Sequence, residues 1–123
     1  MPGIGVTDEL GRRTKQFAIQ VIRLSGELPG TSAAWVIERQ ILWSSTSVAA
    51  NYRATCRARS RAEFIAKLGT VVEEADETLF WLDLLLETGL VTHERITPIV
   101  REANELLAIF SASRRTAKSR HKP

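Results

Sequence analysis

The stretch from Ser60 to Glu87 carries the pattern that most restricts the fold of this chain. Apolar or small residues recur in it in alternating steps of three and four, which keeps one seam of a helix against a partner helix. The predicted seam consists of Ile65, Leu68, Val72, Ala75, Leu79, Leu82 and Leu86. Ser60 and Glu63 can cap the start, and Gly89 can end the helix in a left-handed turn. The pattern predicts one long helix in the core of a helical bundle.

Two further helices are predicted before this stretch. The first runs from about Thr7 to the break at Pro29-Gly30. Thr31 or Ser32 can cap the second, which contains a run dense in small residues from Trp43 to Asn51. Small residues let a neighbouring helix approach closely, so we interpret this run as a packing groove rather than as a source of catalytic serines.

A fourth helix is predicted after Gly89. Thr92 can cap it, but Thr97 can equally be the cap, because Pro98 is well tolerated as the first residue of a helix. Four helices with short connections fold most simply as an antiparallel up-and-down bundle. The predicted fold class is therefore an all-α four-helix bundle.

Length and composition favour a single domain. A chain of 123 residues suits one core, so we expect one domain over residues 1–123 with flexible ends at about 1–6 and 116–123. No apolar run approaches the roughly 20 residues that cross a bilayer, and the start lacks the basic and apolar segments of a secretion signal. Because the single Cys56 cannot form an internal disulfide, the expected compartment is the cytoplasm.

The residues from Ser44 to Val91 also carry an ordered set of short segments. A helix ending in SVAANYR leads through RARSR to FIAKLG, then to EEADETLFWL and a closing glycine. In this order the segments resemble the small four-helix-bundle proteins encoded within intervening sequences of bacterial 23S rRNA genes. The resemblance extends more loosely over residues 10–118.

This resemblance implies an antiparallel four-helix bundle that commonly assembles into a homopentameric ring. A more distant relative is the accessory protein of diversity-generating retroelements. That protein is a basic pentameric bundle that binds nucleic acid and a reverse transcriptase.

The predicted topology separates the charges of the chain, whose formal net charge is +3. The starts of the first and third helices share one pole with the ends of the second and fourth, and most basic residues fall there. Such a charge run is either a solvated surface or a binding site for a polyanion. The second interpretation assigns RNA or DNA binding to Arg12, Arg13, Arg53, Arg57, Arg59, Arg61, Lys67, Arg114, Arg115 and Lys118.

Aromatic residues are scarce at this basic pole. Phe17 and Tyr52 are the ones that the predicted topology assigns to it. Two rings are too few for a platform on which bases stack, so contacts with the phosphate backbone should dominate any binding.

The second half of the long third helix has more apolar surface than one seam needs. We expect part of it to be buried between subunits of a homo-oligomer, together with a tryptophan of the second helix. The predicted oligomer interface consists of Trp43, Phe80, Trp81, Leu84 and Leu85. A ring of parallel subunits would also repeat the basic pole around its axis and strengthen its potential.

Candidate catalytic groups do not converge in the predicted bundle. His93 and His121 lie at opposite poles, and neither completes the Glu-x-x-His spacing of carboxylate di-metal sites. Cys56 has no histidine near it to act as a base, so we interpret it as a partly buried, inert thiol. Gly69 stands alone within a helix, where close helix packing is its simplest use. We expect no enzymatic activity, no metal and no cofactor.

Asn51 and Glu74 fall at comparable heights on the second and third predicted helices. A polar contact between them would fix the register of these helices, and two exposed side chains are the equal alternative.

The leading functional hypothesis is a non-enzymatic, oligomeric bundle whose basic pole binds RNA or DNA. Such a bundle would serve as a scaffold for a nucleic-acid enzyme such as a reverse transcriptase. The alternative is a purely structural or protein-interaction bundle without nucleic-acid binding.

Overall fold

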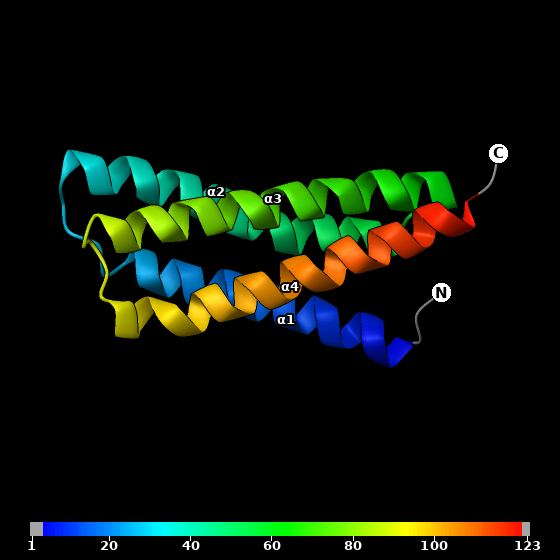
Figure 1. Cartoon of the computed structure of the whole chain (residues 1–123), viewed down its shortest axis with the longest axis horizontal. Helices are drawn as coiled ribbons and strands as arrows, with labels where there is room; N and C mark the ends of the chain where they lie inside the picture. The colour runs from blue at the N-terminus through cyan, green and yellow to red at the C-terminus, as the bar shows by residue number, and fades with distance from the viewer. Residues whose placement is uncertain (1–3, 122–123) are drawn as a thin grey trace.

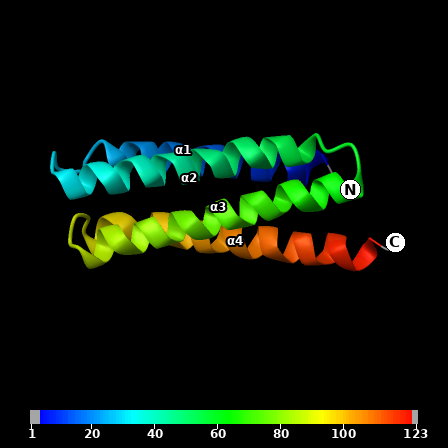
Figure 2. The ribbon, with the colours of Figure 1, turned by 90° about the horizontal axis from the view of Figure 1, so that it is seen from above.

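Four helices make up the regular structure of the described part of the chain. The computed structural model describes residues 4–121, with side chains from Glu9 onward. The helices are α1 (Ile4–Ser25), α2 (Ser32–Cys56), α3 (Arg61–Glu87) and α4 (His93–Arg120). The chain turns back at each connection, so that successive helices run in opposite directions (Figures 1 and 2). The prediction of an all-α protein with four helices is confirmed.

A hydroxyl side chain caps the start of α2, of α3 and of α4. Thr31, Ser60 and Thr92 each accept a hydrogen bond from the backbone N–H three residues later, at 3.2, 3.0 and 3.2 Å. Each bond satisfies an amide that the first turn of a helix leaves unpaired. The cap of α4 is therefore Thr92, and Pro98 lies inside the helix rather than at its first position.

The helices α3 and α4 terminate in different ways at their C-terminal ends. Gly89 has a φ of +74°, and the N–H of Leu90 donates to the Leu85 carbonyl at 3.1 Å, which is the predicted left-handed termination. In contrast, α4 continues to Arg120, through residues 116–120 of the end that was predicted as flexible. Basic residues in a last helical turn are stabilised by the helix dipole, which favours this extension.

The first helix begins earlier than predicted. The sequence predicts its start at about Thr7, and α1 begins at Ile4, within the end predicted as flexible at about residues 1–6. Residues 1–3 and 122–123 of the two predicted flexible ends lie outside the described residues.

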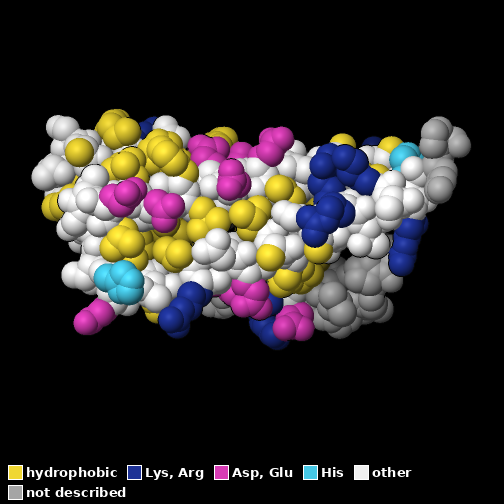
Figure 3. Space-filling model, in the orientation of Figure 1, with side chains coloured by type: hydrophobic (Ala, Val, Ile, Leu, Met, Phe, Trp, Pro, Cys, Tyr) yellow, Lys and Arg dark blue, Asp and Glu magenta, His cyan; other side chains and the backbone are white. Residues whose placement is uncertain are grey.

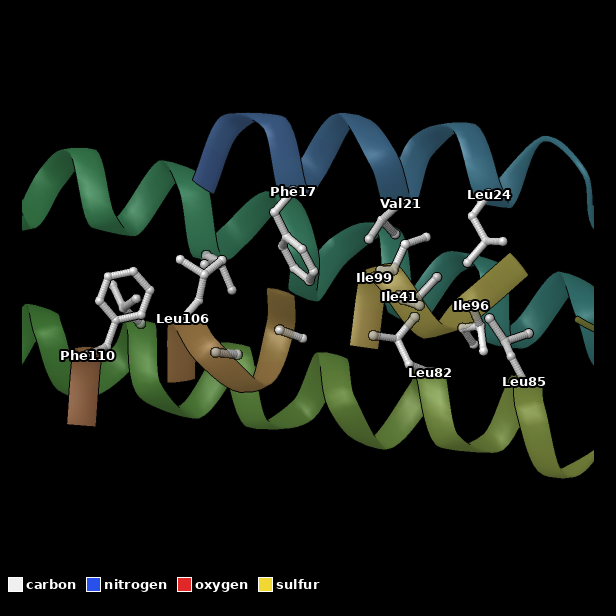
Figure 4. Packing of buried hydrophobic residues seen from close by; sticks show 14 of the residues in the cluster. Phe17, Val21, Leu24, Ile41, Leu82, Leu85, Ile96, Ile99, Leu106 and Phe110 are labelled. Carbon is white, nitrogen blue, oxygen red and sulfur yellow. The ribbon is translucent and has the colours of Figure 1, made fainter. Parts of the chain in front are cut away.

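The apolar core extends along the bundle, and every helix contributes to it. Phe17, Val21 and Leu24 of α1 point towards side chains from the other helices (Figure 4). The largest side chains that are fully buried are Phe17, Phe110, Leu24, Ile41, Leu68, Leu82, Leu85, Ile96, Ile99, Leu106, Val21 and Val48. Each contributes about 1.5–3 kcal/mol through burial. Tyr52 and Phe110 extend the core towards the chain termini, with their ring centroids 5.3 Å apart.

The face that α3 turns to the core is rotated from the predicted seam. Its buried residues are Leu68, Val71, Ala75, Thr78, Leu82 and Leu85. Leu68, Ala75 and Leu82 of the predicted seam are buried as expected. Its members Val72, Leu79 and Leu86 are only partly buried. Because Leu85 lies fully inside a single chain, its place in the predicted oligomer interface is wrong.

The polar contact that joins α2 to α3 is formed by residues other than those predicted. Asn51 donates from Nδ2 to the carbonyl and the hydroxyl of Ser47 on its own helix, at 2.9 and 2.8 Å. Glu74 does not reach Asn51, and its Oε2 is buried with no hydrogen-bond partner among the described residues. The hydroxyls of Thr78 and Ser44 form the cross-helix bond instead, at 2.9 Å, and both residues are fully buried.

The helices pack unevenly around the bundle. The contact between α2 and α3 is the most extensive, and the contact between α1 and α4 is the least. Ser44, Ser45 and Val48 of the small-residue run are buried, which agrees with a packing role for this side of the run, whereas Trp43, Thr46 and Ala50 are exposed. None of the helices in the described residues is both long enough and apolar enough to cross a bilayer.

Candidate nucleic-acid interface

A shallow groove of about 610 Å³ lies where the end of α2 meets the start of α3, and we call it the basic groove. It is lined by Ala50, Arg53, Ala54, Arg57, Arg59, Glu63 and Lys67. The alanines leave room between the long basic side chains, which surround an open depression. The small residues of α2 therefore give this surface its shape, a role that the sequence pattern did not suggest.

The arginines of the basic groove are accessible to a ligand. Arg53, Arg57 and Arg59 are exposed. The nearest carboxylate is that of Glu63, whose Oε2 lies 3.9 Å from Arg59 Nε. An exposed pair of this kind contributes about 0–1 kcal/mol, so it leaves the positive charge of the groove largely available.

Further basic residues lie at the same end of the bundle. Dark blue side chains gather at the right of Figure 3, near the chain termini, while most acidic side chains lie over the middle and the left. Arg12, Arg61, Arg115 and Lys118 are exposed at this end but do not line the groove. The charge separation that the topology predicted is therefore present, and the basic groove is a concave part of this end.

Arg13 was assigned to nucleic-acid binding, but the protein itself holds its side chain. Its Nε and Nη2 donate to Glu102 at 3.1 and 2.7 Å, and Nη2 lies 3.0 Å from Glu105. The hydrogen bond to Glu102 raises the pKa of the Arg13 guanidinium above its usual range. These contacts join α1 to α4, where the helices otherwise touch little. Arg13 is therefore a residue that links α1 to α4 and not a free phosphate ligand.

Arg114 is held in a similar way, between α4 and α3. Its Nε donates to the Ile65 carbonyl at 3.1 Å, and its guanidinium lies over Gly69. A Cβ added at Gly69 would lie only 3.0 Å from Arg114 Nε. Gly69 thus serves the close helix packing that was predicted for it, and Arg114 is a packing residue rather than a free phosphate ligand.

The aromatic residues at this end are turned inward. Phe17 and Tyr52 are buried in the core, and burial raises the pKa of the Tyr52 phenol above its usual range. Phe64 and Phe110 also lie in this half, in addition to the two aromatic residues that the predicted topology assigned to it. Phe110 is buried and Phe64 packs partly buried against the core. The basic groove therefore offers charge and hydrogen bonds but no stacking platform.

Groups capable of catalysis remain apart. Cys56 is exposed in the last turn of α2, so the expectation that it is partly buried is wrong. His93 and His121 lie at opposite ends of α4. Among residues 9–121, no three His, Cys, Asp or Glu side chains are placed to share a metal ion.

The predicted oligomer interface lies mostly in the other half of the bundle. Trp43 and Phe80 are 72% and 56% exposed, whereas Trp81 and Leu84 are partly buried. The rings of Phe80 and Trp81 meet edge to face with centroids 4.9 Å apart. A second shallow groove, of about 660 Å³, lies beside Trp43 and is lined by Ile22, Arg39, Gln40, Leu42, Trp43 and Thr46.

Two comparisons with known proteins find matches over most of this chain. The family model described as "23S rRNA-intervening sequence protein" matches residues 9–112. A crystal structure of a protein with unknown function from the S23 ribosomal protein family of Bacteroides thetaiotaomicron VPI-5482 is also similar. It has a TM-score of 0.78 and 34% sequence identity, covering 84% of this chain and 95% of that chain. None of the curated proteins matches. The matched segment includes residues of all four helices, and the chain belongs to the family of 23S rRNA-intervening sequence proteins.

Proposed function

We propose that this protein is a non-enzymatic, oligomeric bundle that binds RNA or DNA through the phosphate backbone. The basic groove is the observation that carries the proposal, because Arg53, Arg57, Arg59 and Lys67 surround one depression. Arginine presents a planar fork of donors that matches phosphate oxygens. Because no aromatic ring lines the groove, binding should depend on charge and show little sequence preference.

The proposal includes an assembly of several antiparallel up-and-down bundles. The family resemblance implies a homopentameric ring, and the exposed Trp43 and Phe80 supply apolar surface for contacts between subunits. If the subunits are parallel, each contributes one basic groove to the same rim. A rim with repeated positive charge binds a polyanion more strongly than one isolated groove. In the cytoplasm, such a rim would serve as a scaffold for a nucleic-acid enzyme such as a reverse transcriptase.

A purely structural or protein-interaction bundle is the second candidate. The exposed aromatic residues of the acidic half favour it, because subunit contacts there would satisfy them without any ligand. The two candidates differ in whether the basic groove contacts phosphate.

Salt-dependent binding distinguishes these candidates. Fluorescence anisotropy with unrelated single-stranded RNA and DNA probes should show affinity falling steeply with salt, by about 0.7 in the logarithmic slope for each phosphate contact. Arg57→Ala combined with Arg59→Ala should weaken binding equally on all probes and reduce the slope by about 1–2.

The matched control combines Arg23→Ala with Arg101→Ala. It removes the same charge at exposed positions outside the groove and should change binding much less. If both double variants bind alike, or if the parent fails to bind at about 50 mM salt, the structural candidate replaces the proposal.

A further inference from the structure

The exposed faces of α2 and α3 carry opposite charges. None of the exposed residues of α2 is acidic, and the exposed stripe from Trp35 to Ala50 contains Arg39 and Trp43. The exposed positions of α3 after Thr70 contain no base, and consist of Glu73, Asp76, Glu77, Phe80, Asp83 and Glu87. Each face thus combines an exposed aromatic ring with a single sign of charge.

The two faces also differ in shape. The face of α2 is hollowed by the groove of about 660 Å³ between Ile22 and Trp43, and Arg39 lies at this groove with its guanidinium 4.9 Å from the centre of the Trp35 ring. The face of α3 projects Phe80, braced edge to face by Trp81. The indole N–H of Trp81 donates to Glu77 Oε1 at 3.3 Å. One face is a hollow that carries a single base, Arg39, and the other is an acidic projection.

These features lie at the same level along the bundle. The hydrogen bond between Ser44 and Thr78 places those two residues side by side. Since α2 and α3 run in opposite directions (Figure 2), equal steps from this bond remain level, at about 1.5 Å per residue. Arg39 is therefore level with Asp83, and Trp43 is level with Leu79, next to Phe80.

We propose that the two faces meet between neighbouring copies of this chain. Phe80 of one copy enters the groove beside Trp43 of the next, and Arg39 lies near Asp83 across the contact. A rotation about an axis parallel to the helices leaves every residue at its own level, so it brings these residues together without a shift along the bundle. The inference rests on the proposed oligomer and specifies which surfaces form it.

The contact is heterologous, because each copy uses two different faces. Repetition of such a contact closes into a ring when the rotation divides a full turn. The same rotation keeps all basic grooves on one rim. A second copy is the favoured occupant, because this one chain carries both members of a pair matched in charge, shape and level.

Complementation of two damaged faces tests the proposal. Trp43→Asp damages the α2 face and Phe80→Asp damages the α3 face, and both residues are exposed, so circular dichroism should show folded helices. Light scattering should find each variant monomeric. An equimolar mixture should form dimers of twice the monomer mass, because one intact α2 face then meets one intact α3 face and neither remaining face can extend the assembly. A mixture that stays monomeric, or a single variant that keeps the parent mass, overturns the proposal.

Charge reversal tests the paired residues directly. Arg39→Asp alone and Asp83→Arg alone should each weaken the assembly, and the two combined in one chain should restore it. Failure of the combined variant to recover the parent mass overturns the pairing of Arg39 with Asp83.

Two outcomes separate this inference from the proposed function. A monomeric parent that still binds RNA removes only the subunit contact. An oligomeric parent that complements as described but binds no RNA or DNA removes only the nucleic-acid proposal.

Discussion

The two halves of the bundle differ on their surfaces rather than in their cores. The first half carries the chain termini, and the second carries the α1–α2 and α3–α4 turns. Inside, Tyr52 and Phe110 fill the first half as completely as Leu82 and Leu85 fill the second. Outside, the first half presents arginines around small residues. The second presents aromatic rings among carboxylates. The core is thus continuous along the whole length of the bundle, whereas the chemistry of the surface differs between the two halves.

The largest expected effect separates a core phenylalanine from a surface one. Phe110 is 1% exposed. Phe110→Ala should lower the unfolding free energy by about 3–5 kcal/mol, because the substitution leaves a cavity in the core. Phe80→Ala should change the stability of the dilute monomer by less than about 1 kcal/mol and weaken assembly instead. Urea denaturation and light scattering measure both. Equal destabilisation by the two variants would show that Phe80 is part of the monomer core.

The next effect concerns the hydroxyl pair between the two halves. Thr78→Val should lower the unfolding free energy by about 1–2 kcal/mol, because it removes a buried hydrogen bond to Ser44. Ser44→Ala combined with Thr78→Val should cost less than the sum of the single changes, because no hydroxyl is left without its partner. A double-mutant cycle in urea measures this coupling. Strictly additive costs would show that the pair does not link α2 to α3.

The same pair explains how much of the fold the sequence could predict. Caps and breaks predicted four helices because Ser60, Thr92 and Gly89 act within their own turns. The buried face of α3 was harder to predict, because leucines occur on two neighbouring faces of its second half. The polar Thr78 lies on the face that is buried, so its presence disfavoured the correct choice. Thr78 is suitable for the core because its hydroxyl bonds Ser44, 34 residues away, in addition to the Glu74 carbonyl one turn earlier on its own helix.

The candidate site shows a similar limit. Topology placed the basic residues at one end, but the pattern could not separate free arginines from held ones. Arg13 and Arg57 carry the same charge in the sequence. In the structure, a carboxylate oxygen of Glu102 lies 2.7 Å from Arg13 Nη2 and holds that side chain, whereas Arg57 is exposed. That partner lies on α4, so tertiary packing decides which arginines remain available to a ligand.

The third effect concerns the packing of Arg114 on Gly69 in the basic half. Gly69→Ala should be close to neutral in the parent, because a gain in helix propensity of up to about 1 kcal/mol is offset when the added methyl displaces the guanidinium. With Arg114→Ala present, the same change should stabilise the protein by about 0.5–1 kcal/mol. Thermal or urea unfolding of the four proteins gives the comparison. Equal effects of Gly69→Ala in both backgrounds would mean that Arg114 does not require the glycine.

The smallest effect lies at the border of the acidic half, at Glu74. Burial, followed by the charges of Glu77 and Glu73, raises the pKa of this carboxyl above its usual 4.5. The folded state therefore favours the protonated form, whose stabilising contribution is complete below the unfolded pKa and is lost as the pH rises through the folded pKa. Glu74→Gln keeps the group neutral at every pH. It should match the parent in acid and gain on the order of 0.5 kcal/mol at neutral pH. Urea denaturation from acid to neutral pH measures the difference in unfolding free energy. Glu87→Gln, at an exposed position, is the matched control. A gain that is independent of pH, or that appears equally at Glu87, would remove the buried carboxylate as its cause.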